Sequence, residues 1–79
     1  MRLDKYLKVS RLIKRRTIAN EACDAGRVLV NGKVAKASQE IKTDDTIEIQ
    51  FGTKAVQVRV TDVKETTKKD EAKDMFVYL

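Results

Sequence analysis

The stretch of sequence that decides the fold is residues 26–35, Gly-Arg-Val-Leu-Val-Asn-Gly-Lys-Val-Ala. Two short apolar runs flank Asn31-Gly32, and an Asn-Gly pair in that setting is typical of a two-residue β-hairpin turn. Gly26 stands where the preceding helical pattern ends, at a position that favours positive φ. The stretch therefore predicts a helix that stops at Gly26 and a hairpin formed by residues 27–30 and 33–35.

Two amphipathic helices are predicted on the N-terminal side of the hairpin, because apolar residues recur there three and four positions apart. In the first helix, residues 2–10, one face holds Leu3, Tyr6, Leu7 and Ser10. In the second helix, residues 16–25, a narrow apolar stripe holds Ile18, Ala19, Ala22 and Cys23. We expect Leu12 and Ile13 to anchor the turn between the two helices.

Strands are predicted for most of the chain that follows the hairpin. Apolar and polar residues alternate over residues 46–51 and again over residues 56–60, which is the period of half-buried strands. Gly52 is expected to turn the chain between them. Asp44 and Asp45 are expected to form another turn, with both carboxylates in solvent.

The C-terminal segment predicts one more helix and one more strand. Residues 66–74 are polar and are expected to form a short surface helix capped by Thr66 or Thr67. Residues 75–79 are expected to close the sheet. The element order indicates an α+β fold, a small single domain over residues 1–79 in which two N-terminal helices pack on a short, mostly antiparallel sheet.

Charge is distributed unevenly along the chain. The 79 residues carry a net charge of +5. Residues 1–36 hold ten Lys or Arg and three Asp or Glu, whereas residues 37–79 hold seven and nine. Charged residues often only solvate helix faces. Here the acidic residues are separated from the basic ones, so the first half of the chain is expected to meet a polyanion.

Few residues in the sequence support catalysis. The chain has no His, which excludes Ser-His and Cys-His pairs, and one cysteine, which excludes a Cys-x-x-Cys metal or redox site. Cys23 lies on an apolar stripe, as a buried structural thiol would. Asp44-Asp45 is weak evidence for a metal, and no Gly-rich phosphate loop is present. We expect a non-enzymatic chain with no metal or cofactor.

The single cysteine also bears on location. It forms no disulfide within the chain, which fits a reducing compartment. No apolar stretch reaches the length of a signal peptide or a membrane span. A cytoplasmic protein that does not engage a membrane is the expectation.

A candidate polyanion-binding surface follows from the first two helices and the hairpin. Its basic residues are Arg2, Lys5, Lys8, Arg11, Lys14, Arg15 and Arg16. The start of the second helix at Thr17 adds backbone N–H groups that suit a phosphate, and arginine can grip phosphate with two parallel hydrogen bonds. We include Asn20 on the second helix, and Asn31 and Lys33 on the hairpin.

Two side chains in this region have open roles. Asp4 is an acidic residue among basic ones: it is predicted to pair with Lys8, to orient Arg2 or Arg11, or to accept a hydrogen bond from an RNA hydroxyl. Tyr6 lies between Leu3 and Leu7, which favours a place in the core over stacking on a base.

Four ordered motifs together resemble the alpha-L RNA-binding motif, the domain named after small-subunit ribosomal protein S-four. They are Arg2-Leu3-Asp4, Arg16-Thr17-Ile18-Ala19, Gly26-Arg27-Val28 and Val30-Asn31-Gly32-Lys33-Val34. The match covers roughly residues 1–50. Within it, Arg15-Arg16 replaces a frequent Ser-Arg, and Asp44-Asp45 replaces a frequent Gly-Asp. The resemblance implies an RNA-binding motif over about residues 1–60, followed by a polar segment and C-terminal strand over residues 61–79.

The full length is similar to small stand-alone members of this family, related to the fifteen-kilodalton heat-shock protein. The similarity includes Leu12–Thr17, Phe51-Gly52 and Thr66–Lys69. It implies a monomeric factor of ribosome-associated quality control that binds large-subunit rRNA and peptidyl-tRNA on obstructed large ribosomal subunits. It also implies work with the partner RqcH while alanine tails are added to the stalled chain, without polymerising activity of its own.

Four other hypotheses remain open on the sequence. The chain could be a generic RNA- or ribosome-binding module with another role. A DNA-binding helix-turn-helix protein would read bases from the start of its second helix, where Arg16 and Asn20 lie. A hydrolase or transferase could have kept only its binding domain. A protein-interaction module could use the acidic second half of the chain.

Overall fold

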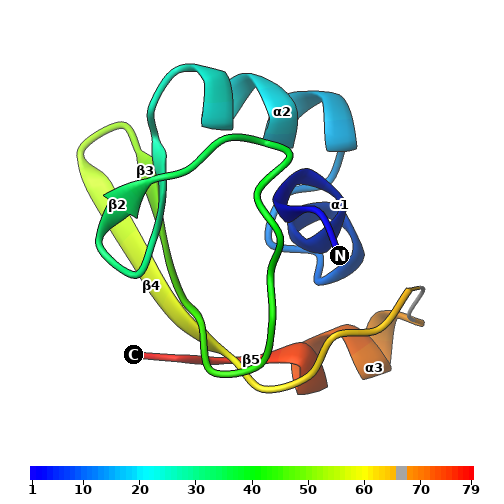
Figure 1. The fold of residues 1–79 in the computed structure, drawn as a ribbon. Coiled ribbons are helices and arrows are strands. Elements are labelled where there is room, and N and C mark those ends of the chain that lie inside the picture. Colours follow the sequence, from blue (N-terminus) through cyan, green and yellow to red (C-terminus); the bar gives the residue numbers. More distant parts are fainter. Residues whose placement is uncertain (66–67) are drawn as a thin grey trace.

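The computed structural model describes residues 1–65 and 68–79. Its helices are α1 (Leu3–Val9), α2 (Arg16–Asp24) and α3 (Lys69–Ala72), and a 3-10 turn, η1 (Lys73–Met75), continues α3. Its strands are β1 (Val28–Val30), β2 (Lys33–Val34), β3 (Thr46–Phe51), β4 (Lys54–Val60) and β5 (Phe76–Tyr78). Figure 1 shows α1 and α2 together beside the sheet, with α3 and β5 at the end away from α2. The predicted α+β architecture is confirmed.

The sheet is antiparallel at every interface, in the order β2-β1-β3-β4-β5. The hairpin between β1 and β2 pairs Val30 with Lys33. Asn31 and Gly32 have φ values of 53° and 83°, the left-handed conformation that a two-residue primed turn requires at both positions. The Asn-Gly prediction is therefore confirmed, and so is the positive φ at Gly26, 75°.

The core lies between α1, α2 and one face of the sheet. Leu3, Tyr6 and Leu7 of α1 have no exposed surface, and they join Ile47, Ile49, Val58 and Val60 of the two longest strands in one apolar cluster. Ala19 and Cys23 of α2 are buried as predicted. The prediction for Ile18 is wrong, because 47% of this residue is exposed. Burial on α2 is thus limited to small residues, which let the helix approach its neighbours closely.

The turn between α1 and α2 differs from the sequence prediction. The first helix was expected to extend to residue 10, but α1 ends at Val9, and Arg11 has a φ of 65°. Its N–H donates to the Lys8 carbonyl, and the Ile13 N–H donates to the Leu7 carbonyl. These bonds close the end of α1 although the left-handed conformation is unfavourable for a residue with a Cβ. The predicted anchor at Ile13 is buried.

The segment after β2 returns to the start of α1. The N–H groups of Leu3 and Asp4 donate to the carbonyls of Gln39 and Ala37, at 2.7 and 3.1 Å. These bonds satisfy N–H groups that a helix leaves free in its first turn. The loop after the hairpin is therefore fixed beside Arg2 and Asp4, although it is more than thirty residues away in sequence.

The C-terminal segment packs against α1 through a tyrosine. The Tyr6 hydroxyl donates to the Met75 carbonyl at 2.7 Å, and both residues are fully buried. Burial raises the pKa of Tyr6, and the charge of Asp62 adds to the shift. Tyr6 is a core residue, which excludes it from stacking on a base in this conformation. The predicted last strand is confirmed as β5, paired with β4.

The predicted cap of the last helix falls on residues that the structure does not describe. Thr66 and Thr67 lie outside the described residues, and α3 begins at Lys69 with Lys68 in the N-cap position and no side-chain cap. The described helix is shorter than the expected residues 66–74.

Replacing Tyr6 with Phe is expected to destabilise the fold by about 1–2 kcal/mol, because it leaves the buried Met75 carbonyl without its donor. Urea unfolding followed by circular dichroism measures the change. Tyr78→Phe is the matched control, since Tyr78 is 70% exposed and surface changes stay within about 0.5 kcal/mol. Equal stabilities of the two variants would show that the Tyr6 hydrogen bond contributes nothing.

Candidate nucleic-acid interface

A buried carboxylate, Asp4, lies at the centre of the candidate site. It is 2% exposed and receives hydrogen bonds from the Lys5 N–H at 2.8 Å and from Asn20 Nδ2 at 3.3 Å. Two guanidinium groups approach it as well. Arg2 Nε lies 3.3 Å from Oδ1, and Arg16 Nε lies 3.3 Å from Oδ2. Asp4 therefore joins the start of α1 to the first two turns of α2.

Each arginine contacts Asp4 with one side of its guanidinium group. Arg2 Nη2 donates to Oδ2 and Arg16 Nη2 donates to Oδ1, both at 3.4 Å. A guanidinium group carries five N–H donors, and no described residue accepts from Nη1 of either arginine. The side chains of Arg2 and Arg16 are 50% and 47% exposed. Arg2 and Arg16 are therefore oriented by Asp4 and present their remaining guanidinium N–H groups to solvent.

The electrostatics of Asp4 keep it charged. Burial alone would raise the pKa of Asp4, but hydrogen bonds from Arg16, Asn20 and the Lys5 backbone, together with the charge of Arg16, lower it below the ordinary value. A charged carboxylate holds both arginines more firmly than a neutral one would. Of the roles left open for Asp4, orienting Arg2 is confirmed, whereas no ion pair joins it to Lys8 or Arg11 in residues 1–65 and 68–79.

Stability should depend on this carboxylate at acid pH. Because the folded-state pKa of Asp4 is lowered, its contribution is complete above the unfolded-state value of about 3.9 and is lost as pH falls through the folded-state value. Wild type is therefore expected to be more stable than Asp4→Asn near neutral pH, and the gap should close toward pH 2. Urea unfolding of both proteins across this range measures it. A gap that stays constant would contradict the assignment.

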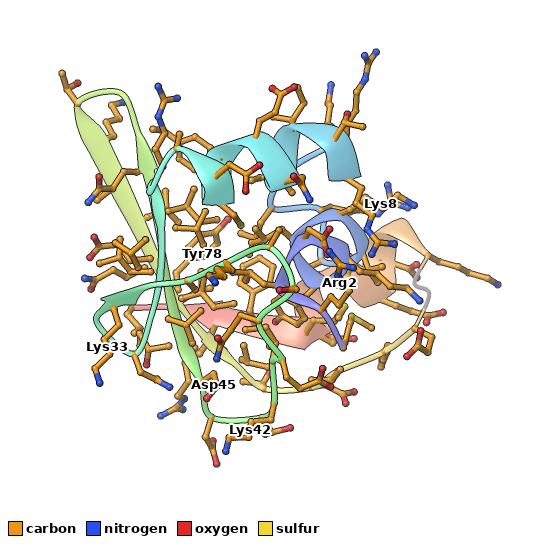
Figure 2. The ribbon with its side chains drawn as sticks, turned by 45° about the horizontal axis from the view of Figure 1, so that its top comes forward. Arg2, Lys8, Lys33, Lys42, Asp45 and Tyr78 are labelled. Atoms are coloured by element: carbon orange, nitrogen blue, oxygen red, sulfur yellow. The ribbon has the colours of Figure 1, made fainter. Side chains whose placement is uncertain are left out.

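The turn between α1 and α2 continues the basic surface from Arg2 and Arg16. Its exposed cations are Arg11, Lys14 and Arg15, and Lys8 at the end of α1 adjoins them; none of these four forms an ion pair with a described residue. Figure 2 shows Arg2 and Lys8 projecting on the same side of the molecule. No side chain caps the start of α2, so the exposed Thr17 adjoins backbone N–H groups that suit a phosphate. The structure therefore places the predicted cations of this turn, Arg11, Lys14 and Arg15, next to the start of α2.

Lys5 differs from the other cations of α1. It is half-buried and its Nζ forms an ion pair with Glu65, which the sequence prediction missed because the partner is sixty residues away. Part of its charge is therefore already balanced within the chain.

The hairpin residues are placed differently from Arg2 and Arg16. Figure 2 shows Lys33 projecting on the side of the molecule away from Arg2 and Lys8. Asn31 Nδ2 donates to Asp45 Oδ1 at 3.1 Å, and Asn31 Oδ1 accepts from the Thr46 N–H at 3.0 Å. Both groups of the Asn31 amide thus hold the hairpin to the turn before β3.

Asp45 corrects one prediction about that turn. It was expected in solvent but is 6% exposed, and its second carboxylate oxygen accepts from the Lys42 N–H at 3.0 Å. Asp44 is exposed as expected, with a φ of 77°. The carboxylate of Asp45 is therefore a structural acceptor that fixes the loop.

A groove beside the arginines contains a cation that the sequence analysis missed. Arg2, Asn20, Lys36 and Ser38 line it, together with Val34, small residues and one carboxylate, that of Asp24. Lys36 is exposed and lines the same groove as Arg2, because the loop after β2 is hydrogen-bonded to the start of α1. The signal was absent from the sequence, since only the long-range backbone pairing joins these residues.

Cys23 has the structural role predicted for it. It is 4% exposed, and burial, with the charges of Asp4 and Asp24, raises the pKa of its thiol to about 11. Near neutral pH it stays protonated and is a poor nucleophile. In the part of the chain that the structure describes, no group of three or more metal-ligating side chains occurs. No helix of this part is long and apolar enough to cross a membrane.

Comparisons with known proteins agree with this geometry. The model of the S4 domain family matches residues 1–47, which include Arg2, Asp4 and Arg16. The RQC P-site tRNA stabilizing factor of Bacillus subtilis is 56% identical over 79 residues, covering 100% of this chain and 92% of that protein. The protein of the same name from Halalkalibacterium halodurans is 58% identical over 76 residues, 96% of this chain and 86% of that protein.

A solved structure extends the comparison to the fold. The trimeric structure of Heat Shock Protein 15 from Vibrio cholerae matches 100% of this chain and 81% of its own, with a TM-score of 0.93 and 25% sequence identity. The expected resemblance to the S-four type domain and to that heat-shock protein is confirmed. Since a family model matches more than half of the chain and relatives match it almost end to end, the chain belongs to the S4-domain family of RQC P-site tRNA stabilizing factors, which are non-enzymatic RNA-binding factors.

Proposed function

We propose that this chain binds large-subunit rRNA and peptidyl-tRNA together on obstructed large ribosomal subunits, and stabilises the tRNA there during ribosome-associated quality control. The observation that carries the proposal is the pair of half-exposed arginines, Arg2 and Arg16, held by buried Asp4. The name of the Bacillus subtilis relative, 56% identical over the full chain, supports the same role.

The mechanism follows from the arrangement of the cations. Arg2 and Arg16 present oriented N–H donors, which suits phosphate better than a mobile charge does. Lys8 at the end of α1 and Arg11, Lys14 and Arg15 on the turn extend this surface in one direction. The groove with Lys36 extends it toward the loop after β2. A surface with two extensions can contact two RNA segments at once. Bridging rRNA and tRNA would hold the tRNA in place without any covalent chemistry.

The finer assignments belong to the same proposal. Thr17 and Asn20 line a pocket with Arg16 and are further contacts in this proposal. Lys5, Asn31 and Lys33 are secondary contacts, because Lys5 and Asn31 already have partners within the chain and Lys33 lies on another side of the molecule. The chain would act in the cytoplasm as a monomer, with RqcH as its partner while alanine is added to the stalled chain. Light scattering after size exclusion tests the monomer, and a trimer would contradict it.

Sucrose-gradient sedimentation of the tagged protein from lysate tests the function. We expect it to migrate with free large subunits that carry peptidyl-tRNA, and to be released by high salt or RNase. Arg16→Ala should move it to the top of the gradient. Sedimentation of wild type at the top under every condition would overturn the proposal.

A further inference from the structure

An apolar groove lies outside the contacts around Asp4. It is bounded by the α1–α2 turn, by α2 and by the end of β3, with a volume of about 420 Å³. Leu12, Ile18 and Phe51 supply its apolar wall. Ile18 is 47% and Phe51 46% exposed. Figure 1 shows the tip of the β3–β4 hairpin and α2 at the same end of the molecule.

Phe51 is exposed for a reason that the strand pattern makes clear. It continues the face of β3 that carries Ile47 and Ile49, which are 0% and 1% exposed. Successive residues of a strand alternate between faces, so Phe51 lies on the core face. It is the last residue before the turn at Gly52, and there other residues bury it only in part. The fold therefore places an aromatic ring on its core face without burying it.

The rim of the groove is cationic. Lys14 and Arg27 are exposed and line it, Gln50 contributes an amide, and no Asp or Glu is among its lining residues. Lys14 belongs to the basic turn that leads to Arg16, so the groove is continuous with the proposed RNA surface. An aromatic ring beside cations is the combination that receives an unpaired base and its phosphate.

We propose that this groove receives one unpaired nucleotide of the bound RNA, whose base stacks on the Phe51 ring and whose phosphate contacts Lys14 and Arg27. Ile18 and Leu12 cover the other edge of the base. The inference rests on the proposed function, since it specifies a contact within RNA binding. It predicts that the chain distinguishes RNA with an unpaired base from RNA without one.

The test compares two RNAs and three variants. One RNA is a stem–loop with an unpaired loop, and the other is the same stem–loop with abasic sites in the loop. Phe51→Ala is expected to weaken binding of the first RNA roughly tenfold, the range for loss of one base–aromatic stack, and to leave the second unchanged. Phe51→Tyr, which keeps the ring, should bind both like wild type. Tyr78→Ala is the matched control, an exposed aromatic residue on β5 away from the groove.

Contrary outcomes separate this inference from the proposed function. If Phe51→Ala binds both RNAs like wild type, or if its affinity for both falls equally, the nucleotide site is overturned. RNA binding through Arg16 is not affected by either result. Arg16→Ala without effect on either RNA would instead overturn the proposed function. Circular dichroism checks that Phe51→Ala folds. If it does not, Phe51→Leu, which keeps apolar bulk without the ring, gives the same two tests.

Discussion

Arg16→Ala is expected to weaken binding to structured RNA by roughly 10- to 150-fold. The physical reason is the loss of charge-assisted hydrogen bonds to phosphate, about 1.5–3 kcal/mol for a well-oriented arginine. Arg16 is oriented by Asp4 and half-exposed, so it meets RNA without first losing side-chain freedom. Fluorescence anisotropy with a labelled rRNA stem–loop at constant salt measures the affinity.

The fold should survive this substitution. Asp4 keeps Arg2, Asn20 and the Lys5 N–H as partners, and half-exposed ion pairs contribute only about 1 kcal/mol or less. Arg59→Ala is the matched control. Arg59 is an exposed arginine on β4, and its replacement removes the same charge away from Asp4. If Arg16→Ala and Arg59→Ala lose RNA affinity equally, net charge explains binding, and the orientation of Arg2 and Arg16 by Asp4 does not.

Asp4→Asn is expected to weaken RNA binding about tenfold although it raises the net charge by one. Without the carboxylate, Arg2 and Arg16 lose the ion pairs that hold them, and ordering two long side chains on binding then costs about 1.4 kcal/mol in affinity. Simple attraction to a polyanion predicts the opposite sign. Stability should also fall by about 1–2 kcal/mol, because a hydrogen-bonded charge is lost.

A control on the neighbouring helix isolates this effect. Glu21 is exposed, lines the same pocket as Arg16 and forms no ion pair with a described residue. Glu21→Gln makes the same charge change and is expected to bind RNA as well as wild type or slightly better. Tighter binding by Asp4→Asn would show that Asp4 repels RNA and does not position the arginines.

Local patterns account for what the sequence predicted well. Asn31-Gly32 predicted its turn because asparagine and glycine are the residues that most readily adopt the positive φ required at both positions. The alternation in residues 46–51 and 56–60 predicted β3 and β4 because half-burial repeats every second residue. The two N-terminal helices were predicted because burial of one helix face recurs every three to four residues.

Long-range contacts account for what the sequence did not show. The role of Asp4 depends on Arg16 and Asn20, twelve and sixteen residues away. Lys5 is paired with Glu65, and Lys36 shares a groove with Arg2 because backbone hydrogen bonds join the loop after β2 to the start of α1. No periodicity records such contacts. Charge alone predicted the basic surface, whereas the orientation of its arginines required the fold.

The sequence also did not predict the degree of burial of individual side chains. Ile18 and Phe51 fit the apolar patterns of α2 and β3, but nearly half of each residue is exposed. Asp45 is the converse case, a turn carboxylate buried because Asn31 donates to it. A pattern reports which face a residue occupies, and only packing decides whether that face is covered.

The salt dependence of RNA affinity tests the central claim most directly. Wild type, Arg16→Ala and Arg59→Ala are titrated with the same RNA over a series of salt concentrations. With about five phosphate contacts, log affinity should fall against log salt with a slope of roughly −3.5 to −4.5 for wild type and Arg59→Ala, and Arg16→Ala should reduce the steepness by about 0.7–0.9. A nearly flat dependence in wild type, or the same slope in all three, would contradict the account.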